Sequence, residues 1–198
     1  MTAVASLESG IAPDRPSGPS AAIVAAYVAG GGVLMASIAL MAGYYNLRHG
    51  AAEWPPEHVD FDEYFSVMLS ATILLATALA GWASSAAKAG NRRQSIAALA
   101  LSGGMALSFV NLAWYTGSTA GFGPSSHAFG TIVIASLVLI SVAVLVAVGF
   151  LAAALLRAQL RAERASDNTI AASVRFFFIV AAAWMVSPVA LYGLMSPR

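Results

Sequence analysis

The chain has 198 residues, of which 59% are hydrophobic and 10% are charged, and its formal net charge is +1. Its mean hydropathy of +0.77 lies far outside the range of ordinary soluble domains, so the sequence predicts an integral membrane protein. The absence of cysteine excludes disulfides, iron–sulfur clusters and metal sites built on thiolates.

Residues 1–20 are rich in Pro, Gly and Ser, and they have too little apolar surface to fold, so we expect a flexible cytoplasmic tail. The remainder, residues 21–198, is expected to form a single all-α domain. A bilayer core of about 30 Å requires about 20 apolar residues in a helix. Long apolar runs therefore predict an integral membrane bundle of five transmembrane helices, at about residues 21–46, 64–87, 95–115, 127–157 and 172–195.

The charged residues between these spans predict an orientation. Seven of the ten Lys and Arg residues fall into two alternate loops or at their edges: Lys88, Arg92, Arg93, Arg157, Arg161, Arg164 and Arg175. The stretch HGAAEWPPEHVDFDEYF, residues 49–65, instead gathers five of the nine acids. The positive-inside rule then places the N-terminus in the cytoplasm and the C-terminus outside.

Small residues in two spans are candidates for helix packing or for a partner interface. Gly30, Gly31 and Gly32 lie in the first span, and Ala100, Gly104 and Ser108 recur every four residues in the third. This spacing lets two helices approach closely, and packing within the bundle is the more common use. In the last span Pro188 predicts a kink, because proline removes a backbone donor.

The spans offer few groups for chemistry. Their apolar runs, residues 21–45, 64–87, 96–115, 128–156 and 176–195, contain no Asp, Glu, Lys or Arg. The three histidines, His49, His58 and His127, lie in loops or at the start of a helix. We therefore expect no catalytic, cofactor-binding or metal-binding residue in this chain. No basic aromatic surface suits nucleic acid. A small transporter or channel is an alternative, with a polar lining from Ser70, Thr72, Thr77, Ser102, Ser108 and Asn111.

Several short motifs resemble one family. Trp54, Pro55 and Pro56 match a Trp-Pro-Pro loop; Gly90, Asn91 and Arg92 match a polar hairpin; Asn111 stands near a usual Gln, before Trp114 and Tyr115; His127 matches the first of two histidines, and Gly130 stands at the second. Together these motifs resemble subunit III of the haem-copper (cytochrome c) oxidases, in its short five-helix bacterial form.

This resemblance implies a non-catalytic accessory subunit of a cytochrome c or quinol oxidase in aerobic respiration. Such a subunit packs against the catalytic subunit I, stabilises it and binds lipid, in the bacterial plasma membrane. Haem and copper would reside in partner subunits. The chain departs from the family where a buried Glu is usual, since Ser37 and Ile38 occupy the matching Ser-Glu positions, so a proton-uptake role is in doubt. An unrelated membrane assembly or scaffold subunit remains an alternative.

Overall fold

The computed structural model describes residues 21–51, 54, 63–159 and 163–190, and the side chains of residues 157–168 lie outside this description. The described part contains five α-helices and no strand: α1 Ala21–Gly50, α2 Glu63–Lys88, α3 Arg92–Thr119, α4 Ala128–Gln159 and α5 Glu163–Met185. Helices are expected of such apolar segments, because a helix satisfies all its backbone hydrogen bonds within one segment.

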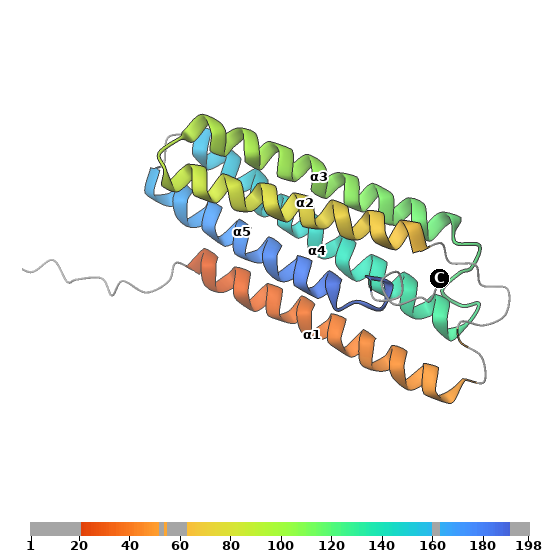
Figure 1. The fold of residues 1–198 in the computed structure, drawn as a ribbon. Coiled ribbons are helices and arrows are strands. Elements are labelled where there is room, and N and C mark those ends of the chain that lie inside the picture. The colour runs from red at the N-terminus through yellow and green to blue at the C-terminus, as the bar shows by residue number, and fades with distance from the viewer. Residues whose placement is uncertain (1–20, 52–53, 55–62, 160–162, 191–198) are drawn as a thin grey trace, which may run out of the picture.

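The helices lie side by side along one long axis (Figure 1). Helices α2, α3, α4 and α5 form a ring in which each packs against the next and α5 closes the ring on α2. Helix α1 packs on the outside of this ring, against α4 and α5 only. The first helix of the bundle therefore depends on the last two for its contacts.

Four of the helices, α1 to α4, are long and apolar enough to cross a membrane. Helix α5 contributes a shorter apolar stretch, Thr169–Met185. The fold is thus all-helical and has at least four helices of membrane-spanning length.

A three-residue connection joins α2 to α3. Gly90 has a φ of 73°, a left-handed conformation that glycine adopts without a steric penalty at the end of a helix. Asn91 then caps α3, and its side chain accepts a hydrogen bond from the amide of Gln94 at 3.4 Å. The polar hairpin expected from Gly90 and Asn91 is therefore a pair of helix caps.

The last helix breaks close to the predicted proline. Helix α5 ends at Met185, and the amide of Ser187 donates to the carbonyl of Trp184 at 2.8 Å in a tight turn. Helical structure resumes at Pro188, and the Ser187 hydroxyl accepts from the Ala190 amide at 3.4 Å. Pro188 thus occupies the first position of a new helical segment, where its missing N–H costs nothing.

A buried tryptophan joins α5 to α2 and α3. Trp184 is fully buried, and its indole ring meets the ring of Phe109 edge-on at 5.2 Å. Its Nε1–H donates to the Ser70 hydroxyl at 2.9 Å, and that hydroxyl donates to the Ser66 carbonyl at 2.8 Å. This chain of bonds joins residues 114 positions apart.

Ser70→Ala should destabilise the bundle, because the substitution leaves the buried Trp184 N–H without its acceptor. We expect the free energy of unfolding, measured by denaturation in mixed micelles with circular dichroism, to fall by about 1 kcal/mol. Ser85→Ala on the same helix is the control, because the exposed Ser85 hydroxyl bonds only to the carbonyl of Trp82. Equal stabilities of the two variants would contradict a structural role for the Trp184 bond.

Candidate functional site

The described residues contain no group of three or more His, Asp or Glu side chains that could hold a metal ion. His49 lies exposed in the last turn of α1, and His58 lies outside the described residues. His127 is partly buried beside the first turn of α4.

His127 has a capping role in this structure. Its Nδ1 accepts a hydrogen bond from the Gly130 amide at 2.8 Å, which satisfies a free N–H at the start of α4. The His127 ring also packs against Phe122 at 5.2 Å. The Nδ1 atom of His127 therefore caps the N-terminus of α4.

Gly130 explains why the second histidine of the family motif is missing. A Cβ atom at Gly130 would lie 2.8 Å from the carbonyl oxygen of Gly123 and 2.9 Å from the Phe122 ring. Because the first of these atoms belongs to the backbone, the space cannot open without moving the loop between α3 and α4. A histidine at position 130 is incompatible with this loop, so the two-histidine pair cannot form here.

Hydroxyl groups of the proposed polar lining are bonded to backbone carbonyls. Four of them bond to the carbonyl four residues earlier in their own helix: Ser70, Thr72, Thr77 and Ser108. Ser102 bonds across to the Ala76 carbonyl of α2 at 2.8 Å, which fixes α3 against α2. Asn111 is exposed on α3. Hydroxyl groups that bond to backbone carbonyls in this way have a structural role in membrane helices.

The position of the usual family acid lies on α1. Ser37 is buried, and its hydroxyl has no hydrogen-bond partner among the described residues. Ile38, in place of the acid, is half exposed and faces away from the bundle. No carboxylate is therefore present at this site.

The three consecutive glycines of α1 have different surroundings. Gly30 is buried against α5, where an added Cβ would lie 2.8 Å from Cδ1, 2.9 Å from Cγ2 and 3.1 Å from Cβ of Ile179. Gly31 and Gly32 have no atom within 4 Å of such a Cβ. Close helix approach within the chain thus involves Gly30.

The small residues of α3 lie on the outside of the bundle. The buried residues of α3 recur every three or four positions on one side of the helix: Ser95, Ala98, Leu99, Ser102, Ala106, Phe109, Ala113 and Thr116. Ala100, Gly104 and Ser108 are exposed on the other side, and a Cβ at Gly104 would meet nothing within 4 Å. We call this exposed row, together with Asn111, the α3 outer face.

An aromatic cluster lies where α1 ends and α4 begins. The ring of Trp54 meets Tyr44 at 5.4 Å and Phe129 at 5.6 Å, both edge-on. Trp54 is the first residue of the Trp-Pro-Pro motif, and Pro55 and Pro56 lie outside the described residues. Trp54 itself thus packs against both α1 and α4.

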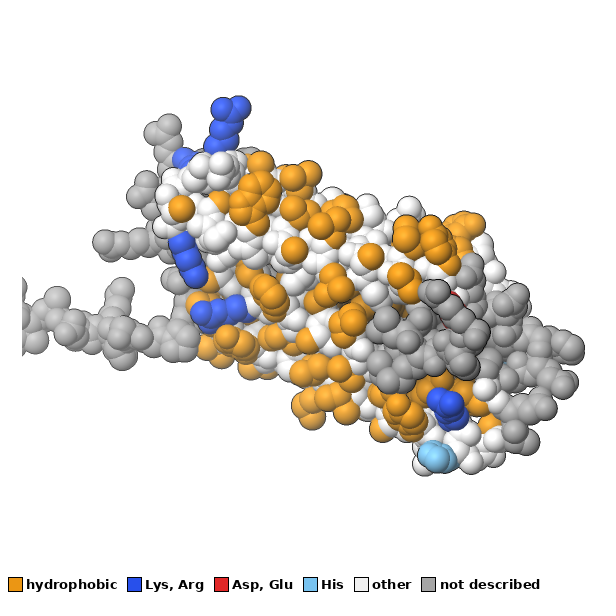
Figure 2. Space-filling model, in the orientation of Figure 1, with side chains coloured by type: hydrophobic (Ala, Val, Ile, Leu, Met, Phe, Trp, Pro, Cys, Tyr) orange, Lys and Arg blue, Asp and Glu red, His pale blue; other side chains and the backbone are white. Residues whose placement is uncertain are grey.

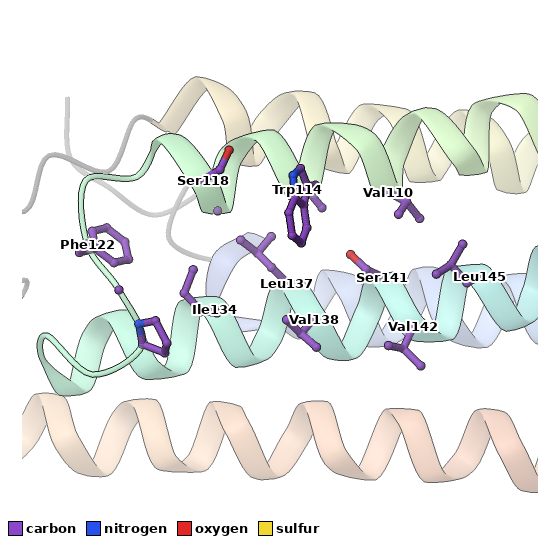
Figure 3. A pocket seen from close by; sticks show the side chains of 14 residues that line it. Val110, Trp114, Ser118, Phe122, Ile134, Leu137, Val138, Ser141, Val142 and Leu145 are labelled. Atoms are coloured by element: carbon purple, nitrogen blue, oxygen red, sulfur yellow. The ribbon is translucent and has the colours of Figure 1, made fainter.

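A pocket lies between α3 and α4, next to the loop that connects them (Figure 3). Its volume is about 490 Å³. Trp114 and Val110 point into it from α3, and Leu137 and Ser141 point toward them from α4. Phe122 of the connecting loop covers one end. We call this the α3–α4 pocket; its apolar lining gives no distinctive motif in the sequence.

Charge is confined to the ends of the visible face. Hydrophobic side chains cover its length, and Lys and Arg side chains lie near its two ends (Figure 2). Lys88, Arg92 and Arg93 flank the α2–α3 connection. On α5, the guanidinium of Arg175 lies 5.5 Å from the centre of the Tyr27 ring.

These features define a class: a multi-pass helical membrane protein whose described residues include no metal-ligand cluster. A comparison with protein families is more specific. The model of the family "Cytochrome c oxidase subunit III" matches residues 37–195, so the chain belongs to that family and is a subunit III of the respiratory-chain oxidases. A comparison with curated proteins found no match.

Proposed function

We propose that this chain is the non-catalytic subunit III that packs against the haem-bearing subunit I of a haem-copper oxidase, stabilises it and binds lipid. The family match over residues 37–195 carries this proposal. It is supported by the lack of a metal-ligand cluster in the described part of the chain and by hydroxyls that bond to backbone carbonyls. Haem and copper then belong to partner subunits.

Co-purification tests this function directly. An affinity tag on this chain, extracted from native membranes in mild detergent, should recover a subunit I homologue in near-equal amount, with a haem signal in the redox difference spectrum. The separated chain should give a blank metal analysis and no haem absorbance. Catalysis by the remaining complex should persist initially when the chain is missing. Consistent purification without a haem-bearing partner would refute the assignment.

We also propose that the chain crosses a bacterial plasma membrane five times, with its N-terminus in the cytoplasm. The distribution of the described basic residues favours this orientation. Lys88, Arg92 and Arg93 lie at the α2–α3 connection, Arg48 lies at the other end of the bundle in the last turn of α1, and the α3–α4 connection, residues 120–127, has no Lys or Arg. Helix α5 then completes a fifth crossing together with the segment that resumes at Pro188.

Single cysteines test the orientation, because the natural chain has none. Ala89→Cys and Ser125→Cys alter exposed residues in the α2–α3 and α3–α4 connections. In intact cells an impermeant maleimide should label Ser125→Cys, and it should label Ala89→Cys only after the membrane is permeabilised. The reverse pattern would invert the proposed topology.

A further inference from the structure

The α3–α4 pocket is a preformed hollow that extends from the α3–α4 connection along the two helices. It is bounded by two helices that each have the length and hydropathy of a membrane span. Its volume of about 490 Å³ lies within the range of pockets that hold a drug-sized ligand, roughly 300–1,000 Å³. The pocket is therefore large enough for a ligand, and its exposed wall residues Trp114 and Val138 show that it opens to the outside of the chain.

The loop at its end is held in place by the local fold. Phe122, which covers this end, packs against the rings of His127 at 5.2 Å and Phe129 at 6.0 Å. The Thr131 hydroxyl donates to the carbonyl of Pro124, another lining residue. Gly130 allows the loop backbone to lie directly on α4. These contacts keep the end of the pocket closed without a ligand.

The apolar walls of the pocket favour a hydrocarbon ligand. No lining residue is charged, and Ser118, Ser141 and Trp114 are the lining residues whose side chains carry a polar group. The Ser118 hydroxyl already donates to the Tyr115 carbonyl at 2.9 Å. An apolar hollow that opens to lipid gains dispersion contacts when hydrocarbon fills it, and it loses them if it stays empty.

We propose that the α3–α4 pocket holds a hydrocarbon chain of one membrane lipid, which is recognised by its chain and not by its headgroup charge. This inference deepens the lipid-binding part of the proposed function and rests on it. A lipid is favoured over an extended protein segment, because the walls present few polar groups to pair with its free backbone N–H and C=O groups. A helix of another subunit satisfies its own backbone, and the experiment below distinguishes it from lipid.

Trp114 gives the site its polar edge. This residue is 78% exposed at the mouth of the pocket, and it lies five residues before the end of α3, about 7.5 Å along the helix. Tryptophan at this depth places its ring among acyl chains and its N–H near the polar layer. The indole can therefore donate to an ester carbonyl of the lipid, a group that most phospholipids share.

The test uses the complex that is purified through a tag on this chain. It is placed in nanodiscs of phosphatidylcholine or of phosphatidylglycerol, each with a trace of the same lipid carrying a diazirine in one acyl chain. A detergent wash removes loosely held lipid before irradiation, and mass spectrometry then maps the cross-links. We expect retained cross-links on residues 110–114 and 138–145, in similar yield with both headgroups. Leu74 and Leu75 are exposed on α2, and their cross-links should disappear after the detergent wash.

Filling the pocket should strongly reduce lipid retention. Ser141→Phe places a ring between α3 and α4, opposite Trp114 (Figure 3), and should lower the cross-link yield about tenfold. Val138→Phe, also on the pocket wall, is a second variant in case the first does not fold. Val146→Phe is the matched control, because Val146 is exposed on α4 outside the pocket, and it should leave the yield unchanged.

Three results would overturn the proposal: equal retention on α2 and in the pocket, a yield about tenfold higher with the anionic lipid, or protection of the pocket by another subunit. The outcome is separable from that of the subunit assignment. A chain that purifies without a haem-bearing partner and still retains lipid in the pocket would refute the assignment alone.

Discussion

Gly30→Ala should separate α1 from α5 and destabilise the chain by about 1–3 kcal/mol, the usual cost of excess volume in a packed core. The added Cβ would lie 2.9 Å or less from two side-chain atoms of Ile179 and 3.1 Å from its Cβ. Cδ1 can swing away, but Cγ2 and Cβ are held close to the backbone of α5, so the helices themselves must move. Gly30→Leu should have a larger effect, with loss of the folded chain from membranes.

The sign of this effect distinguishes it from helix propensity. Gly43→Ala on the same helix meets nothing within 4 Å, so it should leave stability unchanged or raise it by up to about 1 kcal/mol. Combined with Gly30→Ala, the substitution Ile179→Ala removes Cδ1 and Cγ2, the two nearest atoms, and should restore part of the stability that Gly30→Ala loses. Denaturation in mixed micelles measures the stability of the natural chain, of Gly30→Ala, of Gly43→Ala and of the double variant. A neutral Gly30→Ala variant would show that α1 does not pack closely on α5.

Gly104→Leu should leave the chain folded and weaken its association with subunit I. Gly104 lies on the α3 outer face, where a new side chain meets no atom of this chain. Association of helices in lipid depends on close packing of small residues, so a bulky side chain would hold the partner away. A cost of about 1–3 kcal/mol corresponds to a complex weaker by roughly 5- to 150-fold. Co-purification of subunit I at graded detergent concentrations measures the change.

Gly149→Leu provides a matched control on another helix. Gly149 is an exposed glycine of α4 with nothing within 4 Å of an added Cβ, so the substitution adds the same volume to another face. Equal weakening by both variants would indicate a nonspecific effect. Unchanged association of Gly104→Leu would place the interface away from the α3 outer face. The exposed Asn111 carboxamide on this face offers a second test, because a partner helix can supply its hydrogen bond.

Much of the architecture could be predicted from hydropathy. The apolar runs predicted a helical membrane protein, and four helices have the required length and hydropathy. The proline at 188 predicted the break that follows Met185. The family resemblance, carried by short motifs such as Trp54 and the Gly90–Asn91 hairpin, is confirmed by the match to the family. These features depend on local composition and spacing, which a single sequence displays.

The arrangement of helices in space could not be predicted in the same way. Gly30 and Gly104 have equivalent local sequence environments, since each is a glycine in an apolar helix, yet one lies against Ile179 and the other faces outward. Long apolar helices have side chains of similar hydropathy on every side, so periodicity does not mark the inner face. The α3–α4 pocket could not be predicted from the sequence for the same reason, because its walls have the composition of any membrane helix.

The position of α1 outside the ring has a consequence for biosynthesis. Helix α1 ends at residue 50, whereas its first contact partner, α4, begins at residue 128. At about 5–20 residues per second, α1 waits about 4–16 s after it is made before translation reaches α4. During this interval it must persist alone in the bilayer, which its mean hydropathy of 2.0 permits. The neighbouring pair α2 and α3 can associate as soon as it is inserted, so membrane integration and assembly follow different orders in this chain.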